Sequence, residues 1–324
     1  MDVVTALAGV FGVVAVGYGC RALGWLEPQA GDVLMRLVIR LFFPAFLLSQ
    51  LLGNPMMSGN ALSTAWRAPA AGLGLTLLAY LVAASVAYTI GPRIGLTTPD
   101  ARRTFVAVVG VCNFGYVPIQ IVQRLLEHEP GVLPTLLVHN LGGEFALWAI
   151  TVPLLAGGLG REGSMGSRLW RVVRRGLSPP VLAILAALLL NFLGWGVWLQ
   201  DSPAGALLYS LGQVAIPIAV LLIGATIHGA LKAEPLLRRP AVTAVGVALR
   251  LVVIPVLWLG VMAGLRVQGD LLRVVQVEAA MPSTMLPIVL SRVYGGDIGV
   301  ATRVAVVSTL VSLVTIPLVL GWLL

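Results

Sequence analysis

Two segments of this sequence place helix breakers and polar residues inside apolar runs. Residues 112–118 read CNFGYVP, and residues 281–287 read MPSTMLP. A proline inside a helix removes a backbone hydrogen bond, and a backbone group freed in lipid must be paired by protein, water or a ligand. We therefore expect a discontinuous helix at each segment, with a plain proline kink as the alternative. If the broken ends cross, two helix N-termini meet, and their N–H groups and partial positive charge would attract an anion.

The predicted anion site draws most of its members from these two segments. Arg40 is added because it lies within an apolar run, about one turn deeper than Arg36. Arg40 could hold a substrate carboxylate, neutralise an internal acid, or extend its guanidinium to the membrane surface. The candidates for substrate binding are Asn113, Gly115, Tyr116, Pro118, Pro282, Ser283, Thr284, Pro287 and Arg40.

Ionisable residues inside apolar runs are candidates for ion coupling, because burying them in a membrane is costly. Glu278, one turn before Pro282, could bind a proton or a sodium ion, or could reach interfacial water. Glu144 could belong to the same ion path or could pair with an arginine. His139 could relay protons, although a hydrogen-bonded structural role is more frequent for such a residue. Arg250 is also deep, but the sequence names no partner for it.

The sequence offers no motif for an enzyme or a metal site. It contains neither Gly-x-Ser-x-Gly nor His-Glu-x-x-His, the patterns typical of nucleophilic and zinc hydrolases. Cys20 and Cys112 make no metal-ligand spacing. We therefore expect no cofactor, and Na⁺ or H⁺ as the candidate coupling ion.

The elements that must position these residues are membrane helices. The chain is 58% hydrophobic and only 10% charged, against about 25% charged residues in soluble domains. A spanning helix needs about 20 apolar residues. The expected fold is all-α, with runs at 2–23, 33–52, 68–90, 102–126, 133–156, 180–199, 204–229, 240–265, 271–292 and 298–323.

The basic residues predict the orientation of these ten runs. Thirteen of the 21 Lys and Arg residues fall in the loops after odd-numbered runs and four in the loops after even-numbered runs. The positive-inside rule then puts the odd loops in the cytoplasm and both termini outside an inner membrane. This distribution explains the net charge of +8 without a nucleic-acid partner.

The longest connection divides the runs into two sets of five. We expect a first repeat over 1–156, a basic cytoplasmic connector over 157–179 and a second repeat over 180–324. An odd number of runs in each half makes the second half insert upside down, which is an inverted repeat of the kind common in transporters.

Several motifs in order resemble the auxin efflux carrier family, whose bacterial members include malonate-type permeases. They are LVIRLFFP at 37–44, NFGYVP at 113–118, LGQVAIP at 211–217, AMPS at 280–283 and YGGD at 294–297. The resemblance implies a fold shared with bile acid:sodium symporters, in which the fourth and ninth helices break and cross. It also implies an elevator-like cycle, a carboxylate substrate with Asn113 as a ligand, and Glu278 at the position of a sodium-binding acid.

The sequence departs from the family pattern at two positions. Leu286 stands near the place where the family usually carries an asparagine, and Arg40 stands where an uncharged polar residue is frequent. A less polar substrate or altered ion coupling could follow from Leu286. The added cation at Arg40 would favour an anion.

We therefore expect a secondary transporter of a small organic anion, bound at the crossing of the fourth and ninth runs. A sodium-coupled symporter of bile acids or other apolar organic acids is the alternative, followed by an intramembrane enzyme or a channel. Membrane lipid is the expected surrounding, and a homodimer is compatible with the resemblance.

Overall fold

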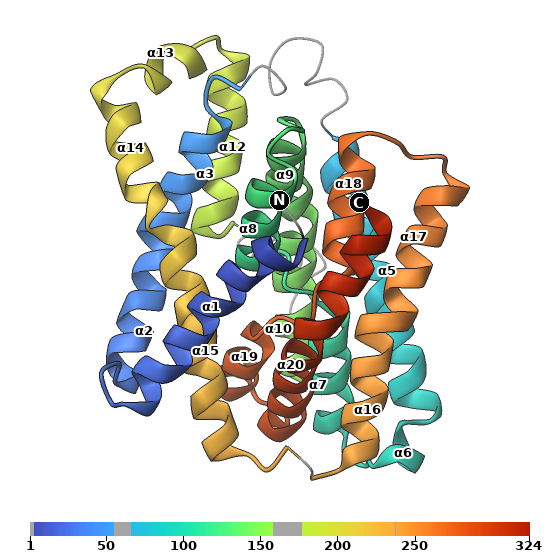
Figure 1. The fold of residues 1–324 in the computed structure, drawn as a ribbon. Helices are drawn as coiled ribbons and strands as arrows, with labels where there is room; N and C mark the ends of the chain where they lie inside the picture. The colour runs from blue at the N-terminus through green and yellow to red at the C-terminus, as the bar shows by residue number, and fades with distance from the viewer. Residues whose placement is uncertain (1–2, 55–65, 158–176, 237) are drawn as a thin grey trace, which may run out of the picture.

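The computed structural model describes residues 3–54, 66–157, 177–236 and 238–324 (Figure 1). Most of the predicted connector, 157–179, lies outside these ranges. Within them the chain is helical, and its only β pairing is an isolated antiparallel bridge between Cys112 and Ser283. The helices long and apolar enough to cross a membrane are Arg67–Thr89, Pro203–Ala233, Pro240–Gly264 and Ile298–Leu323.

Each of the ten predicted runs begins and ends within five residues of a helix or a row of successive helices, but the sixth is divided where one helix was expected. The elements before the connector are α1 (Val3–Ala22), α2 (Pro28–Leu37), η1 (Val38–Phe42), α3 (Phe43–Leu51), α5 (Arg67–Thr89), α6 (Gly91–Ile94), α7 (Pro99–Gly110), α8 (Tyr116–Leu125), α9 (Val132–Ala146), η4 (Leu147–Thr151) and α10 (Val152–Leu155). Those after it are α12 (Pro179–Phe192), α13 (Gly196–Gln200), α14 (Pro203–Gln213), α15 (Ala215–Ala233), α16 (Pro240–Ala248), η5 (Leu249–Val253), α17 (Ile254–Gly264), α18 (Asp270–Ala279), α19 (Leu286–Tyr294) and α20 (Ile298–Leu323).

The sixth run, 180–199, was wrongly predicted as one helix. α12 ends at Phe192, and the backbone of Gly194 turns the chain with a φ of +77°. The N–H of Trp195 then donates to the carbonyl of Leu190 at 2.9 Å. A glycine in the left-handed region just past a helix is a frequent stop signal. α12 is therefore only 14 residues long, and α13 follows as a separate short helix.

Three π-helical turns in the described chain each end two residues before a proline. η1, η4 and η5 precede Pro44, Pro153 and Pro255, respectively. Proline lacks an N–H and clashes with the preceding turn, and one widened turn accommodates both defects without ending the helix. Arg40 lies in η1 and Arg250 lies in η5, so both arginines project from widened turns.

Glycines bring helix backbones into direct contact at two places. An added Cβ on Gly17 of α1, or on Gly224 of α15, would lie 1.9 Å from a backbone oxygen of the other helix. An added Cβ on Gly72 of α5 or on Gly142 of α9 would lie 2.2 Å or 2.1 Å from such an oxygen. Small residues permit this close approach between membrane helices. The pairs α1–α15 and α5–α9 are therefore tightly packed.

The helices form two groups by their contacts; in Figure 1 α2, α3, α12 and α14 lie on the left, and α5, α16, α17 and α18 lie on the right. The first helix group contains α1, α2, α3, α12, α14 and α15. The second helix group contains α5, α7, α9, α10 and α16 to α20. α8 contacts α1 and α15 of the first group as well as α9 and α18 of the second. The boundary between the groups therefore passes along α8.

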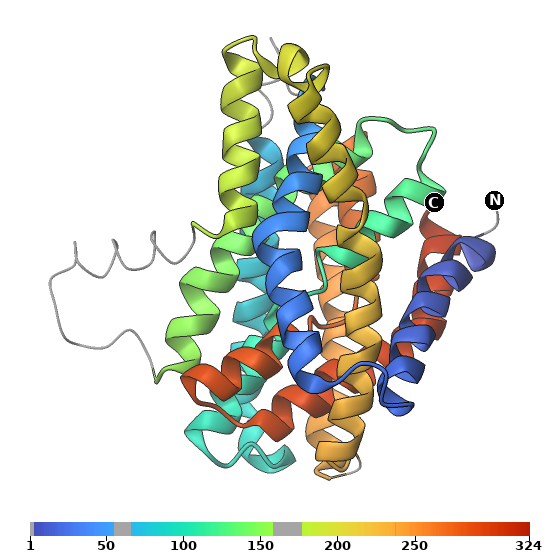
Figure 2. The ribbon, with the colours of Figure 1, turned by 90° about the vertical axis from the view of Figure 1, so that its left-hand side faces the viewer.

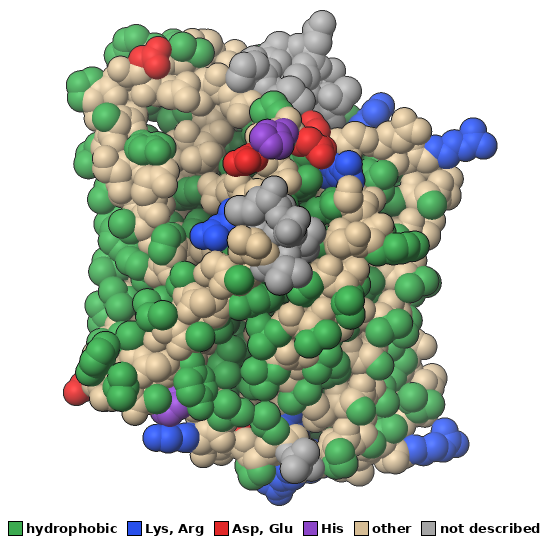
Figure 3. All heavy atoms as spheres, in the orientation of Figure 1, with side chains coloured by type: hydrophobic (Ala, Val, Ile, Leu, Met, Phe, Trp, Pro, Cys, Tyr) green, Lys and Arg blue, Asp and Glu red, His purple; other side chains and the backbone are tan. Residues whose placement is uncertain are grey.

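The surface fits a lipid environment. Hydrophobic side chains cover the middle of the face in Figure 3, and charged side chains gather mostly toward its two ends. Exposed tryptophans lie at helix ends and turns, as is typical of membrane interfaces. They are Trp25, Trp66, Trp195, Trp198 and Trp322.

Candidate functional site

The two interrupted helices meet through their backbones. α7 ends at Gly110 and α8 begins at Tyr116, while α18 ends at Ala279 and α19 begins at Leu286. The extended peptides between them run antiparallel: the N–H of Asn113 donates to the carbonyl of Pro282 at 2.8 Å, and the N–H of Thr284 donates to the carbonyl of Val111 at 3.1 Å. These two bonds pair backbone groups that the interruptions free. We call this junction the crossing, residues 111–115 and 280–285.

Two polar side chains from other helices complete the crossing. Asn140 of α9 donates through Nδ2 to the carbonyl of Phe114 at 2.8 Å. The hydroxyl of Ser308 on α20 accepts from the N–H of Ser283 at 3.2 Å. Both donors and acceptors are buried. Asn140 and Ser308 were not predicted as site residues, although each is a polar residue within an apolar run.

Both helices that restart at the crossing begin without a side-chain cap from the N-cap residue. These residues are Gly115 for α8 and Met285 for α19. Pro118 and Pro287 lie within the first turns, where a helix has unpaired N–H groups in any case. Their position makes them helix starters. The positive ends of the two helix dipoles therefore lie at the crossing.

A pocket of about 40 Å³ opens beside the crossing, at the boundary between the two helix groups. Asn113, Val117 and Pro282 line it on the side of the crossing. The other lining residues are Phe11 and Val14 of α1, Ile223 and Ile227 of α15, and Thr309, Leu310, Ser312, Leu313 and Ile316 of α20. The lining is mostly apolar, with one amide and two hydroxyl side chains. Of the predicted substrate residues, only Asn113 and Pro282 reach this pocket.

The other predicted members surround the crossing. Ser283 is buried, and its hydroxyl has no hydrogen-bond partner among the described residues. Thr284, Gly115 and Tyr116 are half-buried. The ring of Tyr116 packs edge-on against Phe43 of α3, with 5.1 Å between the ring centroids. Tyr116 thus joins α8 to the first helix group.

A second pocket of about 180 Å³ follows α8 away from the crossing. It is lined by Phe46 of α3, by Gln120, Gln123 and Arg124 of α8, and by Gln213, Ile216 and Pro217 at the α14–α15 junction. The side-chain oxygen of Gln120 is buried and has no partner in the described chain. This pocket is more polar than the first and also lies at the group boundary.

Glu278 and His139, predicted separately as ion-coupling residues, lie in contact. His139 Nδ1 is 3.2 Å from Glu278 Oε1, and both side chains are buried. Arg250 of η5 is also fully buried, with its guanidinium carbon 4.9 Å from the ring centroid of Trp258. Trp258 is held in turn by a 2.9 Å bond from its Nε1 to the carbonyl of Leu75. These groups lie on the α5 and α9 side of the crossing.

The structure keeps Glu144 and Arg40 apart from this cluster. Glu144 is half-buried and accepts a 2.9 Å hydrogen bond from Nε1 of Trp148, one turn along the same helix. The side chain of Arg40 is exposed on η1 and lines neither pocket. Among the described residues no group of three or more His, Cys, Asp and Glu side chains could hold a metal ion.

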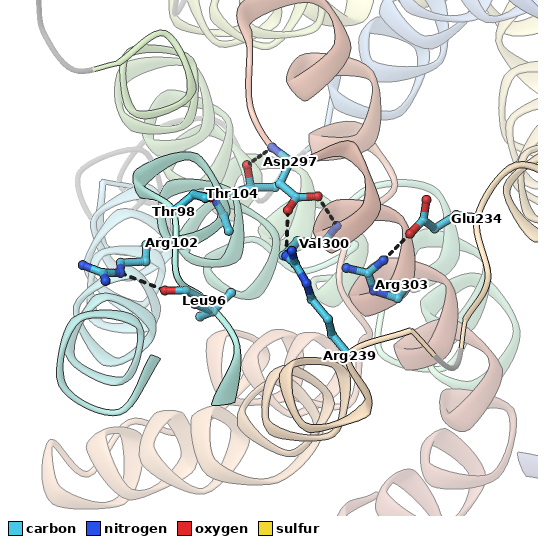
Figure 4. Close-up of polar contacts among 10 residues, drawn as sticks. Leu96, Thr98, Arg102, Thr104, Glu234, Arg239, Asp297, Val300 and Arg303 are labelled. Carbon is cyan, nitrogen blue, oxygen red and sulfur yellow. Dashed lines mark hydrogen bonds and ion pairs between the residues drawn. The ribbon is translucent and has the colours of Figure 1, made fainter. Parts of the chain in front are cut away.

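A polar network joins the loops at the end of the molecule where α6 lies (Figure 4). Asp297 caps α20 by accepting from the N–H of Val300 at 3.1 Å, and it pairs with Arg239 at 3.2 Å. The N–H of Asp297 donates to the hydroxyl of Thr104 at 2.9 Å. Beside it, Arg303 pairs with Glu234. The Asp in the YGGD motif therefore holds the start of α20 against α7 and the α15–α16 loop.

Two comparisons with known proteins match nearly the whole chain. A family model described as "Membrane transport protein" matches residues 2–320. An "Uncharacterized transporter" of Methanothermobacter thermautotrophicus is 26% identical over 317 residues, which cover 94% of this chain and 93% of the relative.

Proposed function

This chain belongs to the membrane transport protein family, which includes the auxin efflux carriers, and we propose that it is a secondary transporter of a small organic anion with an apolar body. That it is a multi-pass membrane transporter follows from the family. The substrate class, its site and the transport cycle are our proposal. The observation that carries it is the exposure of Asn113 and the crossing to a pocket between two helix groups.

The crossing suits a carboxylate. The two helix dipoles place partial positive charge at the crossing, and the half-buried Asn113 side chain can donate a hydrogen bond. In the first turn of α19 the N–H of Leu286 already donates to Thr284 Oγ1 at 3.4 Å and Pro287 has no N–H, so we assign the backbone donors to the start of α8. The rest of the lining is mostly valine, isoleucine, leucine and phenylalanine, which would contact an apolar body. A strongly polar dicarboxylate fits this lining less well. The apolar lining favours apolar organic acids, which are the substrates of the alternative function that the sequence suggested.

The pocket is too small for such a substrate in this conformation. Ligand pockets usually measure about 300–1,000 Å³, whereas this one measures about 40 Å³. The two helix groups must therefore separate or slide to admit a substrate. The pairs α1–α15 and α5–α9 make backbone contact within the first and the second group, respectively, so each group can move as a unit. This supports an elevator-type cycle, in which the second group carries the crossing past the first.

The packing also supports two inverted five-helix repeats. α1 packs on α15 while α12 packs on α3, and α20 packs on α7 while α9 packs on α18. If the two halves are equivalent, the α1–α15 contact corresponds to the α12–α3 contact, and the α20–α7 contact corresponds to the α9–α18 contact. We propose ten membrane-spanning segments in an inner membrane, with both termini extracytoplasmic, because the basic residues favour that orientation.

The proposal can be tested by uptake into proteoliposomes. Radiolabelled dicarboxylates, indole acids and more apolar carboxylic acids would be offered under imposed sodium, proton and potassium-diffusion gradients. We expect saturable uptake with counterflow, which a channel would not show. Asn113→Ala should abolish this uptake and leave the thermal unfolding midpoint unchanged.

A matched control is Ser210→Ala on α14, whose hydroxyl is exposed and bonds its own helix at Ala206. It should transport at the wild-type rate. Wild-type uptake kinetics in Asn113→Ala would remove the crossing from the binding site. The absence of saturable uptake for every carboxylate tested, in correctly inserted protein, would overturn the substrate class.

A further inference from the structure

The second pocket has the chemistry of a binding site apart from the crossing. It measures about 180 Å³, and it shares no lining residue with the first pocket. Three of its lining side chains are glutamine amides, and Arg124 is the only charged residue in the described lining. The lining therefore offers a positive charge and hydrogen-bond donors, with no acidic side chain to repel an anion.

The polar residues of this pocket lie along one face of α8. Gln120, Gln123 and Arg124 follow Tyr116 by four, seven and eight positions. Residues at these spacings share one face of a helix. Tyr116 is the first residue of α8 after the crossing, so this face leads from the crossing to the second pocket.

The amide of Gln120 is buried without a partner for its oxygen. The residue is 8% exposed, and its side-chain oxygen accepts no hydrogen bond in the described chain. An amide carries two N–H donors besides this oxygen. A buried polar group that the chain leaves unpaired is costly and calls for a specific explanation. A polar ligand in the pocket that Gln120 lines would supply the missing partner.

Aromatic rings form the apolar wall and continue toward the crossing. The buried ring of Phe46 on α3 lines the pocket. It stacks on Phe43, with 6.1 Å between the ring centroids and 8° between the planes. Phe43 in turn meets Tyr116 edge-on at 5.1 Å. A row of three rings therefore connects the second pocket with the start of α8.

Arg124 can reach a ligand across the boundary between the helix groups. Its guanidinium lies beside α1, because a Cβ added at Gly9 would lie 2.0 Å from Nη1 of Arg124. A guanidinium has five N–H donors, so it can bind a ligand while it keeps contacts within the chain. Its planar fork matches a carboxylate. The charge, the amides and the aromatic wall together suit a carboxylate with an apolar body.

We propose that the second pocket is an outer binding site for a small organic carboxylate, with the carboxylate on Arg124 and Gln120 and the apolar body on Phe46. At about 180 Å³ it is smaller than pockets for drug-sized ligands, which measure about 300–1,000 Å³. In the proposed orientation α8 ends at the extracytoplasmic side, so an anion outside reaches this site before the crossing. The role in transport rests on the proposed function, whereas binding at this site does not.

The test measures the access of anions to the pocket and needs no transport. Full-length protein in detergent would carry Gln213→Cys, at an exposed lining residue, with Cys20→Ser. Its labelling by a sulfonate and by a trimethylammonium methanethiosulfonate would be compared, each relative to a free thiol. We expect the anionic reagent to react several-fold faster. Benzoate should slow labelling saturably, and the neutral benzyl alcohol should not.

Substitutions on α8 separate the charge from the amide. Arg124→Gln should remove both the preference for the anionic reagent and the protection by benzoate, whereas Arg124→Lys should keep the preference. Gln120→Leu should weaken protection several-fold and leave the preference unchanged. Arg93→Gln, at an exposed arginine of α6, is the matched control and should change neither.

Three results would overturn the proposal. They are equal relative rates for the two reagents, no protection by benzoate at any soluble concentration, and protection that persists in Arg124→Gln. If Arg124→Gln does not fold, Gln120→Leu still decides the question, because unchanged protection in that variant would remove the buried amide from the site. A failed uptake screen would overturn the proposed function and leave these labelling results untouched.

Discussion

Replacing Gly224 with alanine should push α15 away from α1. The added Cβ would lie 1.9 Å from the carbonyl oxygen of Val14 and 2.8 Å from the backbone nitrogen of Tyr18. Both are backbone atoms, so no side-chain rotation can relieve the overlap. The first distance is about 1.5 Å shorter than the 3.4 Å at which ordinary contact begins, so the helices must separate by about that amount.

The free-energy cost of this overlap can be isolated by comparison with a second glycine on the same helix. Alanine is favoured over glycine in a helix by about 1 kcal/mol, and this gain partly masks any packing loss at Gly224. Gly229 of α15 has no atom within 4 Å of an added Cβ, so Gly229→Ala receives the gain alone. The difference between the two variants is then the overpacking cost, about 1–3 kcal/mol.

The assay is thermal unfolding in detergent with a thiol-reactive dye. Cys112 is buried at the crossing and should react only when the structure opens; the other free thiol, the half-buried Cys20, is replaced by serine in every variant so that it does not react with the dye. Gly224→Ala should unfold several degrees below Gly229→Ala. Equal midpoints would refute the backbone contact between α1 and α15 and, with it, the argument that the first helix group moves as a unit. Gly17→Ala on α1, whose added Cβ would lie 1.9 Å from the carbonyl oxygen of Leu221 on α15, should behave like Gly224→Ala.

Three further substitutions have expected outcomes. Asn191→Leu should lower the unfolding midpoint, because its amide holds two backbone groups at the end of α3 at 2.7 and 2.9 Å and unpaired buried groups cost about 1–3 kcal/mol each. Gly296→Ala should lower the unfolding midpoint more than Gly24→Ala. Both glycines have positive φ, but only an added Cβ at Gly296 would overlap a neighbour, since Thr104 Oγ1 would lie 2.7 Å from it. Asn140→Ala should lower both the midpoint and the uptake rate, because it releases a carbonyl of the crossing; an unchanged uptake rate would show that the bond is structural only.

The interruptions of the fourth and ninth runs were predictable because their causes are local. Proline, glycine and small polar residues stand within a few positions of one another at 112–118 and 281–287, and the helices end there in the structure. The break after Phe192 has an equally local cause, in Gly194, but it was missed because the apolar composition continues through Trp198. Hydropathy reports the environment of a segment and not its hydrogen bonds.

The surroundings of single side chains were much less predictable. In a membrane helix that is apolar on all sides, the sequence does not show which face is turned inward, so the exposure of Arg40 and the burial of Arg250 could not be told apart. The contact of His139 with Glu278 joins residues 139 positions apart, and it depends on the packing of α9 against α18. The π turns add to this difficulty, because each one rotates the residues that follow.

The shortness of α12 has a consequence for the lipid around it. At about 1.5 Å per residue, its 14 residues extend about 21 Å, whereas the hydrocarbon core of a bilayer is about 30 Å thick. A helix this short is accommodated by local thinning of the membrane, and the exposed Phe192, Trp195 and Trp198 at its end are suited to hold the headgroups there. If α12 spans the bilayer as proposed, we expect the lipid sheet to be indented beside the first helix group and the apolar barrier to be narrower there than in the surrounding bilayer.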